Sequence, residues 1–105
     1  MFPEFIERLT QEVKGENDTH NVTIFTLASC SWCKKCKAFF LERGIKYRYI
    51  DLDMIDISEK SKILQFLKET YKPERISYPF LVWDEDFVVG YNPNKYEELI
   101  KLGGN

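Results

Sequence analysis

Apolar side chains recur at helical spacing in several segments of this chain, and polar side chains fill the positions between them. The spacing predicts four helices: residues 2–14, residues 32–43, a segment capped by Asp56 or Ser58 that ends near Tyr71, and residues 94–102. Gly15 follows the first of these helices and Gly44 the second, where a residue of left-handed conformation commonly ends a helix.

Short apolar and β-branched runs lie between the predicted helices. They predict strands over residues 22–27, 47–52, 79–83 and 87–89. An acidic turn joins the last two strands as an antiparallel hairpin, whereas the helix between the first two strands requires parallel pairing. The expected fold class is therefore α/β. It has a four-stranded mixed sheet with the element order βαβαββα, flanked by helices and preceded by an extra N-terminal helix.

The length and charge of the chain narrow the possible functions. Its 105 residues fit a single domain, which we divide into an N-terminal helix (1–15) and a core fold (21–102). The net charge is -2 and no basic stripe is present, so nucleic acid is not an expected partner. Charges interrupt residues 2–14, unlike the apolar run of a signal peptide or a membrane span. We therefore expect a cytoplasmic monomer without membrane contact.

All three cysteines, Cys30, Cys33 and Cys36, lie within one short stretch. A disulfide scaffold would spread an even number along the chain, so this cluster indicates redox chemistry or a metal site in a reducing compartment. Two thiols separated by two residues at the start of a helix can close a small disulfide ring, and the helix N-terminus stabilises the attacking thiolate. This geometry predicts that Cys30 attacks a substrate disulfide and that Cys33, one turn further on, resolves the mixed disulfide.

Cys36 leaves a second function open. The spacing C-x-x-C-x-x-C puts three sulfurs within reach of one zinc ion or iron–sulfur cluster. We prefer the interpretation that Cys36 packs against the sheet as a small apolar side chain. A fourth metal ligand is missing, because His20 precedes the strand and lies at its opposite end. A metal-binding carrier that uses Cys30, Cys33 and Cys36 remains the alternative to a redox enzyme, and a redox-regulated interaction module is a third hypothesis.

Several side chains near the cysteines have both a functional and a structural interpretation. Trp32, between the first two cysteines, is expected to be partly exposed and to form an apolar docking platform. Three lysines either stabilise the thiolate or form a solvated helix face: Lys34, Lys35 and Lys37. Asp51 and Asp53 end the second strand, where acids are more often solvated or capping than catalytic, so we assign them no catalytic role.

The order of elements, together with three motifs, resembles the glutaredoxins of the thioredoxin superfamily. The motifs are Cys30-Ser31-Trp32-Cys33, Ser77-Tyr78-Pro79 and Val89-Gly90-Tyr91-Asn92-Pro93. The resemblance covers nearly everything after Asn21 and implies a thiol–disulfide oxidoreductase of the thioredoxin/glutaredoxin fold. It also implies that a cis-proline faces the cysteines and that a residue before it offers backbone groups to an extended peptide or to glutathione. The implied substrate-binding residues are Trp32, Ser77, Tyr78, Pro79, Gly90 and Tyr91.

The chain departs from typical glutaredoxins where that family binds glutathione. Ser31-Trp32 replaces Pro-Tyr, Leu27 stands in place of a lysine, and Asn92-Pro93 stands where paired aspartates follow a glycine. Each missing charge-assisted contact is worth about 1.5–3 kcal/mol, so glutathione is not favoured as a ligand.

Residues 90–95 look more like the glutaredoxin-like redoxins that supply electrons to ribonucleotide reductase and are reduced by a flavin disulfide reductase. That likeness implies an electron carrier with protein disulfides as substrates, ribonucleotide reductase among them, and a disulfide reductase as electron donor. We expect no cofactor beyond the redox-active Cys30–Cys33 disulfide.

Overall fold

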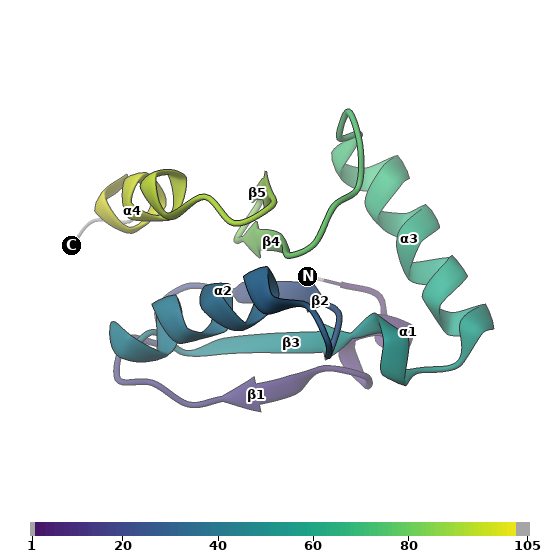
Figure 1. Ribbon diagram of the computed structural model, residues 1–105, viewed down its shortest axis with the longest axis horizontal. Helices are drawn as coiled ribbons and strands as arrows, with labels where there is room; N and C mark the ends of the chain where they lie inside the picture. Colours follow the sequence, from purple (N-terminus) through teal and green to yellow (C-terminus); the bar gives the residue numbers. More distant parts are fainter. Residues whose placement is uncertain (1, 103–105) are drawn as a thin grey trace.

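A mixed sheet forms the centre of the protein in the computed structural model, which describes residues 2–102 (Figure 1). Its five strands have the order β1-β3-β2-β4-β5. Strands β2 and β3 pair in parallel, and the other neighbours are antiparallel. The strands are β1 (Gln11–Val13), β2 (Val22–Thr26), β3 (Tyr47–Asp51), β4 (Phe80–Trp83) and β5 (Asp86–Val89).

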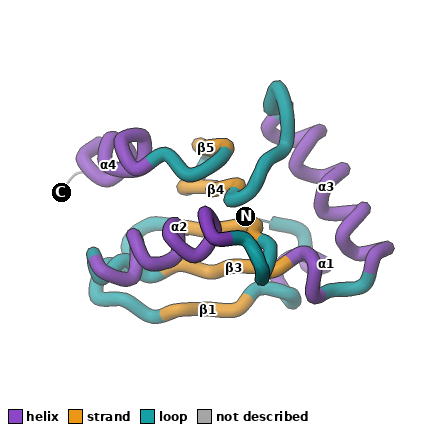
Figure 2. Tube along the Cα trace, viewed as in Figure 1, coloured by secondary structure: helices purple, strands orange, loops and turns teal. Residues whose placement is uncertain are grey.

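Helices cover both faces of this sheet. Figure 2 shows them in purple and the strands in orange. The helices are α1 (Glu4–Glu7), α2 (Ser31–Glu42), α3 (Ile57–Tyr71) and α4 (Pro93–Leu102), with a short 3-10 helix over Leu52–Met54. Side chains of α2 and α4 pack with Val22 and Ile24 of β2, whereas side chains of α1 and α3 pack with Phe25. Since neighbouring side chains of a strand point to opposite faces, this central strand is buried along its whole length.

The predicted order βαβαββα is confirmed for β2 through α4. The helix between β2 and β3 connects parallel strands, and β4 and β5 form the predicted antiparallel hairpin. Asp56 is the N-cap residue of α3, and Gly44 adopts a left-handed backbone with φ of 66° just after α2. Within residues 2–102, no helix is long and apolar enough to cross a membrane.

The prediction of a helix over residues 1–15 is wrong, and the sheet has five strands rather than four. The helix ends at Glu7, whose carbonyl oxygen accepts the hydroxyl of Thr10 at 2.8 Å. Strand β1 follows and pairs antiparallel with β3, with Glu12 opposite Arg48. An isolated helix of this length is marginal in water, so pairing with the otherwise open edge of β3 is the more stable arrangement.

Gly15 was expected to stop a helix, but its role is to permit a close approach between two backbone segments. A Cβ atom at Gly15 would lie 2.6 Å from the carbonyl oxygen of Gly44. Two residues later, the N–H of Asn17 donates to the carbonyl of Gly44 at 2.9 Å, and the carbonyl of Asn17 accepts from Lys46 at 2.9 Å. The N-terminal segment is thereby held against the turn between α2 and β3.

Candidate active site

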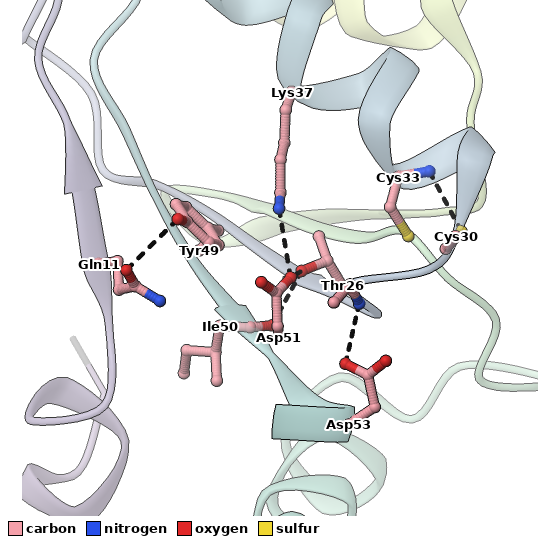
Figure 3. Close-up of polar contacts among 10 residues, drawn as sticks. Gln11, Thr26, Cys30, Cys33, Lys37, Tyr49, Ile50, Asp51 and Asp53 are labelled. Carbon is pink, nitrogen blue, oxygen red and sulfur yellow. Dashed lines mark hydrogen bonds and ion pairs between the residues drawn. The ribbon is translucent and has the colours of Figure 1, made fainter. Parts of the chain in front are cut away.

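Cys30 is the N-cap residue of α2, with φ of -84° and ψ of 117°. Its Sγ accepts a hydrogen bond from the backbone N–H of Cys33 at 3.2 Å (Figure 3). The N–H of Cys30 donates to the carbonyl of Leu27 at 3.1 Å. The Cys33 amide and the helix dipole both stabilise negative charge on the sulfur. Because the side chain is also partly exposed, Cys30 has the access and the environment of an attacking thiolate.

Cys33 lies in the first turn of α2 and is fully buried. Burial, followed by its hydrogen bond with the Cys30 side chain, raises the pKa of the Cys33 thiol to about 12. The backbone N–H of Leu27 opposes this shift without reversing it. Cys33 is therefore a protonated thiol at neutral pH, and both cysteines of the pair are reduced in this structure.

The loop before β4 supplies a second wall of the site. The Tyr78–Pro79 peptide bond is cis, and Pro79 is buried. The carbonyl of Pro79 accepts from the N–H of Gly90 at 2.7 Å, which joins the start of β4 to the end of β5. Burial raises the pKa of Tyr78, and the charge that Cys33 acquires when it ionises raises it further, so the phenol lies within electrostatic range of the dithiol. Ser77 is half-buried just before it.

Trp32 forms an aromatic surface beside the dithiol. Its side chain is 55% exposed and stacks on Tyr91 with ring centroids 5.7 Å apart and an interplanar angle of 29°. The Nζ atom of Lys35 lies 4.5 Å from the centroid of the Trp32 ring. The sequence placed Trp32 and Tyr91 in the site separately, and the structure brings them together as one platform.

Asp51, at the end of β3, pairs with the middle of α2, and Asp53 holds the loop before that helix; the sequence indicated neither contact. The Asp51 carboxylate lies 3.2 Å from Nζ of Lys37 and accepts the hydroxyl of Thr26 (Figure 3). Of the two expected roles, solvated or capping, the first does not apply, and Asp51 stands at the N-cap of the 3-10 helix without a side-chain capping hydrogen bond. Asp53 accepts the backbone N–H of Ala28 at 2.8 Å in the loop before Cys30. The only sequence signal for these contacts is a lysine one turn after Cys33 and acids at the end of the neighbouring strand.

The three lysines after Cys33 have different surroundings. Lys37 pairs with Asp51, and its ammonium lies 4.0 Å from the centroid of the Tyr49 ring, so its charge is compensated away from the thiolate. Lys35 lies over Trp32, and Lys34 is exposed. The prediction that all three form one thiolate-stabilising or solvated group therefore does not describe Lys37.

Cys36 is fully buried in the core between α2, α4 and the sheet. Its Sγ lies 3.5 Å from the hydroxyl of Tyr96, a polar contact that the sequence did not indicate. Among residues 2–102, no three His, Cys, Asp or Glu side chains are grouped so that they could hold a metal ion. His20 lies away from the cysteines, with Nδ1 2.7 Å from a carboxylate oxygen of Asp84. No observation supports the metal-binding alternative.

A cavity of about 540 Å³ lies apart from the cysteines. It is lined by Phe2, Arg48 and residues of the β4–β5 turn, and the guanidinium of Arg48 is paired with the carboxylate of Glu7 inside it. None of the three cysteines lines this cavity.

Comparisons with known proteins agree with this architecture. The family model described as Glutaredoxin matches residues 22–88. "Glutaredoxin 1" of Rickettsia bellii is 28% identical over 87 residues, which cover 79% of this chain and 86% of that protein. A crystal structure of a glutaredoxin from Methanosarcina mazei Go1 superimposes with a TM-score of 0.72 at 23% identity, covering 86% of both chains. A glutaredoxin from Archaeoglobus fulgidus gives a TM-score of 0.68 at 26% identity, covering 79% of this chain and 88% of that one.

Proposed function

The chain belongs to the glutaredoxin family of thiol–disulfide oxidoreductases, and we propose that it acts as a dithiol electron carrier that reduces disulfide bonds in other proteins. The observation that carries this proposal is the pairing of a partly exposed Cys30 at the N-cap of α2 with a buried Cys33 one turn inside the helix. The 3.2 Å contact between the Cys33 amide and Cys30 Sγ stabilises the thiolate that starts the reaction.

The reaction proceeds by two exchanges of disulfide bonds. First, the Cys30 thiolate forms a bond with one sulfur of the substrate disulfide, and the other substrate sulfur leaves as a thiolate. Next, Cys33 loses its proton, its sulfur forms a bond with Cys30 Sγ, and the second substrate sulfur leaves. The substrate gains two electrons, which the dithiol loses as it becomes the Cys30–Cys33 disulfide. One of the two protons that the substrate sulfurs take up comes from Cys33, and the other comes from solvent, which received the Cys30 proton when the thiolate formed.

The high pKa of Cys33 orders these two steps. At about 12, it keeps Cys33 protonated until the mixed disulfide exists, so attack on free substrate falls to Cys30. The thiolate that leaves in the first step is a base formed beside Cys33 and can accept its proton. Resolution by Cys33 is therefore coupled to the departure of the first substrate sulfur.

The surroundings of the dithiol favour a protein substrate over glutathione. Leu27 offers no cation for the carboxylates of glutathione, and the side chain of Asn92 accepts the N–H of Lys95 at 3.1 Å rather than carrying a charge that could meet an amine. Trp32 and Tyr91 offer an apolar platform suited to a polypeptide. We propose a flavin disulfide reductase as the electron donor and, from the likeness of residues 90–95, ribonucleotide reductase as one target.

Trapping of the mixed disulfide tests the assignment of the two cysteines. A Cys33→Ser variant should accumulate a covalent adduct with a protein disulfide, because Cys30 still attacks and nothing resolves the product. The matched Cys30→Ser variant should form no adduct, and mass spectrometry distinguishes the two. An adduct that forms in Cys30→Ser but not in Cys33→Ser would reverse the two roles.

A comparison of electron donors tests the substrate preference. Turnover on a model protein disulfide should be supported by a disulfide reductase of the thioredoxin-reductase type and should be weak with glutathione and its reductase. Robust glutathione-dependent turnover would contradict the preference while leaving the dithiol mechanism intact. Absence of turnover with both donors would instead favour a redox-regulated interaction module.

A further inference from the structure

A chain of hydrogen bonds runs from the core of the protein to the substrate edge of the site. The thiol of Cys36 contacts the hydroxyl of Tyr96 at 3.5 Å, and that hydroxyl donates to the carbonyl of Gly90 at 2.8 Å. The N–H of Gly90 in turn donates to the carbonyl of Pro79 at 2.7 Å. This series of hydrogen bonds therefore links α2, one turn beyond Cys33, with α4, the end of β5 and the cis-proline.

The direction of each hydrogen bond follows from the protons that are present. A carbonyl oxygen can only accept, so the single hydroxyl proton of Tyr96 is committed to Gly90. Tyr96 can then only accept from Cys36, which makes the S–H group the first donor. Burial raises the pKa of Cys36 to about 12 and also raises that of Tyr96, so both protons stay in place at neutral pH.

The backbone of Gly90 is held by hydrogen bonds at both its N–H and its carbonyl. Its φ is 84°, and a Cβ atom at this position would meet nothing within 4 Å, so no packed side chain fixes its orientation. The Tyr96 hydroxyl holds the carbonyl from the core side, and the edge of the Tyr96 ring supports Tyr91 with centroids 5.9 Å apart and an interplanar angle of 74°. Tyr91 is the residue on which Trp32 stacks.

We propose that Cys36 and Tyr96 are positioning residues that hold the Gly90–Tyr91 edge in the conformation that receives an extended segment of the substrate protein. This inference rests on the proposed function and assigns to the third cysteine a role that is neither redox nor metal-binding. Cys36 acts through Tyr96, and Tyr96 acts through the backbone of Gly90. Loss of either should weaken substrate binding without impairing the attack of Cys30.

Steady-state kinetics on a disulfide-containing peptide, together with alkylation by iodoacetamide, separate binding from attack. Tyr96→Phe should raise KM about fivefold, the worth of one neutral hydrogen bond, and Cys36→Ala about twofold. In the Tyr96→Phe background, Cys36→Ala should add nothing, because its contact is already gone. The rate at which iodoacetamide alkylates Cys30 should change less than twofold in all variants, since this small reagent needs no contact with the Gly90 edge.

Tyr71→Phe is the matched control, because it removes a half-buried phenol hydroxyl that lies with the helices on the other face of the sheet. It should leave KM unchanged. The inference would be overturned if the effects of Cys36→Ala and Tyr96→Phe on KM were additive, or if Tyr71→Phe raised KM as much as Tyr96→Phe does. It would also be overturned if the alkylation rate of Cys30 fell as KM rose. If Tyr96→Phe does not fold, Cys36→Val carries the test, with faster hydrogen exchange at the Gly90 amide as the expected result and unchanged exchange as the contrary one.

The same experiments distinguish a failure of the proposed function from a failure of the positioning role. If the unmodified protein does not turn over any disulfide with either electron donor, the proposed function fails. If the unmodified protein turns over and KM is unaffected by Tyr96→Phe, the proposed function stands and the positioning role of Tyr96 and Cys36 fails.

Discussion

Replacing Cys36 by alanine should give a stability change that depends on pH. The thiol has an ordinary pKa of 9.0, and burial raises its pKa to about 12 in the folded protein. The folded state therefore keeps a proton that the unfolded chain releases as the pH passes 9. By linkage, the stability that the protonated thiol contributes is fully present below pH 9 and is lost progressively between pH 9 and pH 12.

The size of this effect follows from the two pKa values. One pKa unit corresponds to 1.36 kcal/mol, so at pH 10 the preference of the unfolded state for the thiolate amounts to about 1.4 kcal/mol. Alanine has no proton to release. The destabilisation caused by Cys36→Ala at pH 7 should therefore shrink by about 1.4 kcal/mol at pH 10. Cys33 titrates in both proteins, so its contribution cancels in the difference.

Urea unfolding under reducing conditions at pH 7, 8.5 and 10 measures this change. Ile45→Val is a suitable control, since it alters the same core cluster and removes no titratable group. It should lower the free energy of unfolding by about 1 kcal/mol, and by the same amount at every pH. A Cys36→Ala penalty that is constant from pH 7 to pH 10 would show that the thiol titrates equally in the folded and unfolded states, and a penalty that grows would show that its pKa is lower in the folded state. The burial of Cys36 described here would then be wrong.

Three further predictions concern the anchoring of the site and of the N-terminal segment. Asp51→Asn should lower the free energy of unfolding in urea by about 2 kcal/mol, because it leaves the largely buried Lys37 without its partner. Glu97→Gln, in a more exposed ion pair, should lower it by less than about 1 kcal/mol, and equal losses would contradict the anchoring role of Asp51. Gly15→Ala should lower the free energy of unfolding, measured by thermal unfolding, by about 3 kcal/mol, since the new Cβ would meet backbone atoms. Gly44→Ala should lower it by about 1 kcal/mol, from the left-handed conformation alone, and a larger loss for Gly44→Ala than for Gly15→Ala would refute the close approach at Gly15. Trp32→Ala should raise KM for a protein disulfide several-fold while changing the free energy of unfolding by less than about 0.5 kcal/mol. An unchanged KM would show that Trp32 does not contribute to substrate docking.

The core of the fold could be predicted from local sequence signals. Strand β2 is a run of apolar and β-branched residues, Gly44 follows the helix after it, and the β4–β5 hairpin has a short acidic turn, so pattern and turn chemistry agree. The N-terminal segment could not be assigned in the same way. Phe5, Leu9 and Val13 are spaced as in a helix, but the segment folds partly as a strand because β3 offers it an open edge. That edge exists only in the assembled sheet.

The site residues also differ in whether local sequence or the assembled fold determines their contacts. Cys30 and Cys33 follow from their spacing at the start of a helix, because both the reacting groups and the helix dipole are local. The Tyr96 contact with Cys36 joins residues 60 positions apart, and in the sequence Tyr96 is only an aromatic residue on an amphipathic helix. Likewise, the contact of Asp51 with Thr26 depends on the parallel pairing of two strands. Contacts of this kind become visible only when the fold is known.

Strand β1 also has a consequence for how the protein behaves at high concentration. By pairing with β3, it covers the edge of Tyr47, Arg48 and Tyr49, which would otherwise be an open template for another copy of the chain. The outer edge that β1 itself presents is only three residues long and carries Glu12. The opposite edge, β5, is also short and begins with an acid. The N-terminal segment thus occupies the edge at which a strand of another molecule could pair. A chain that lacked residues 2–14 would be prone to aggregate through β3.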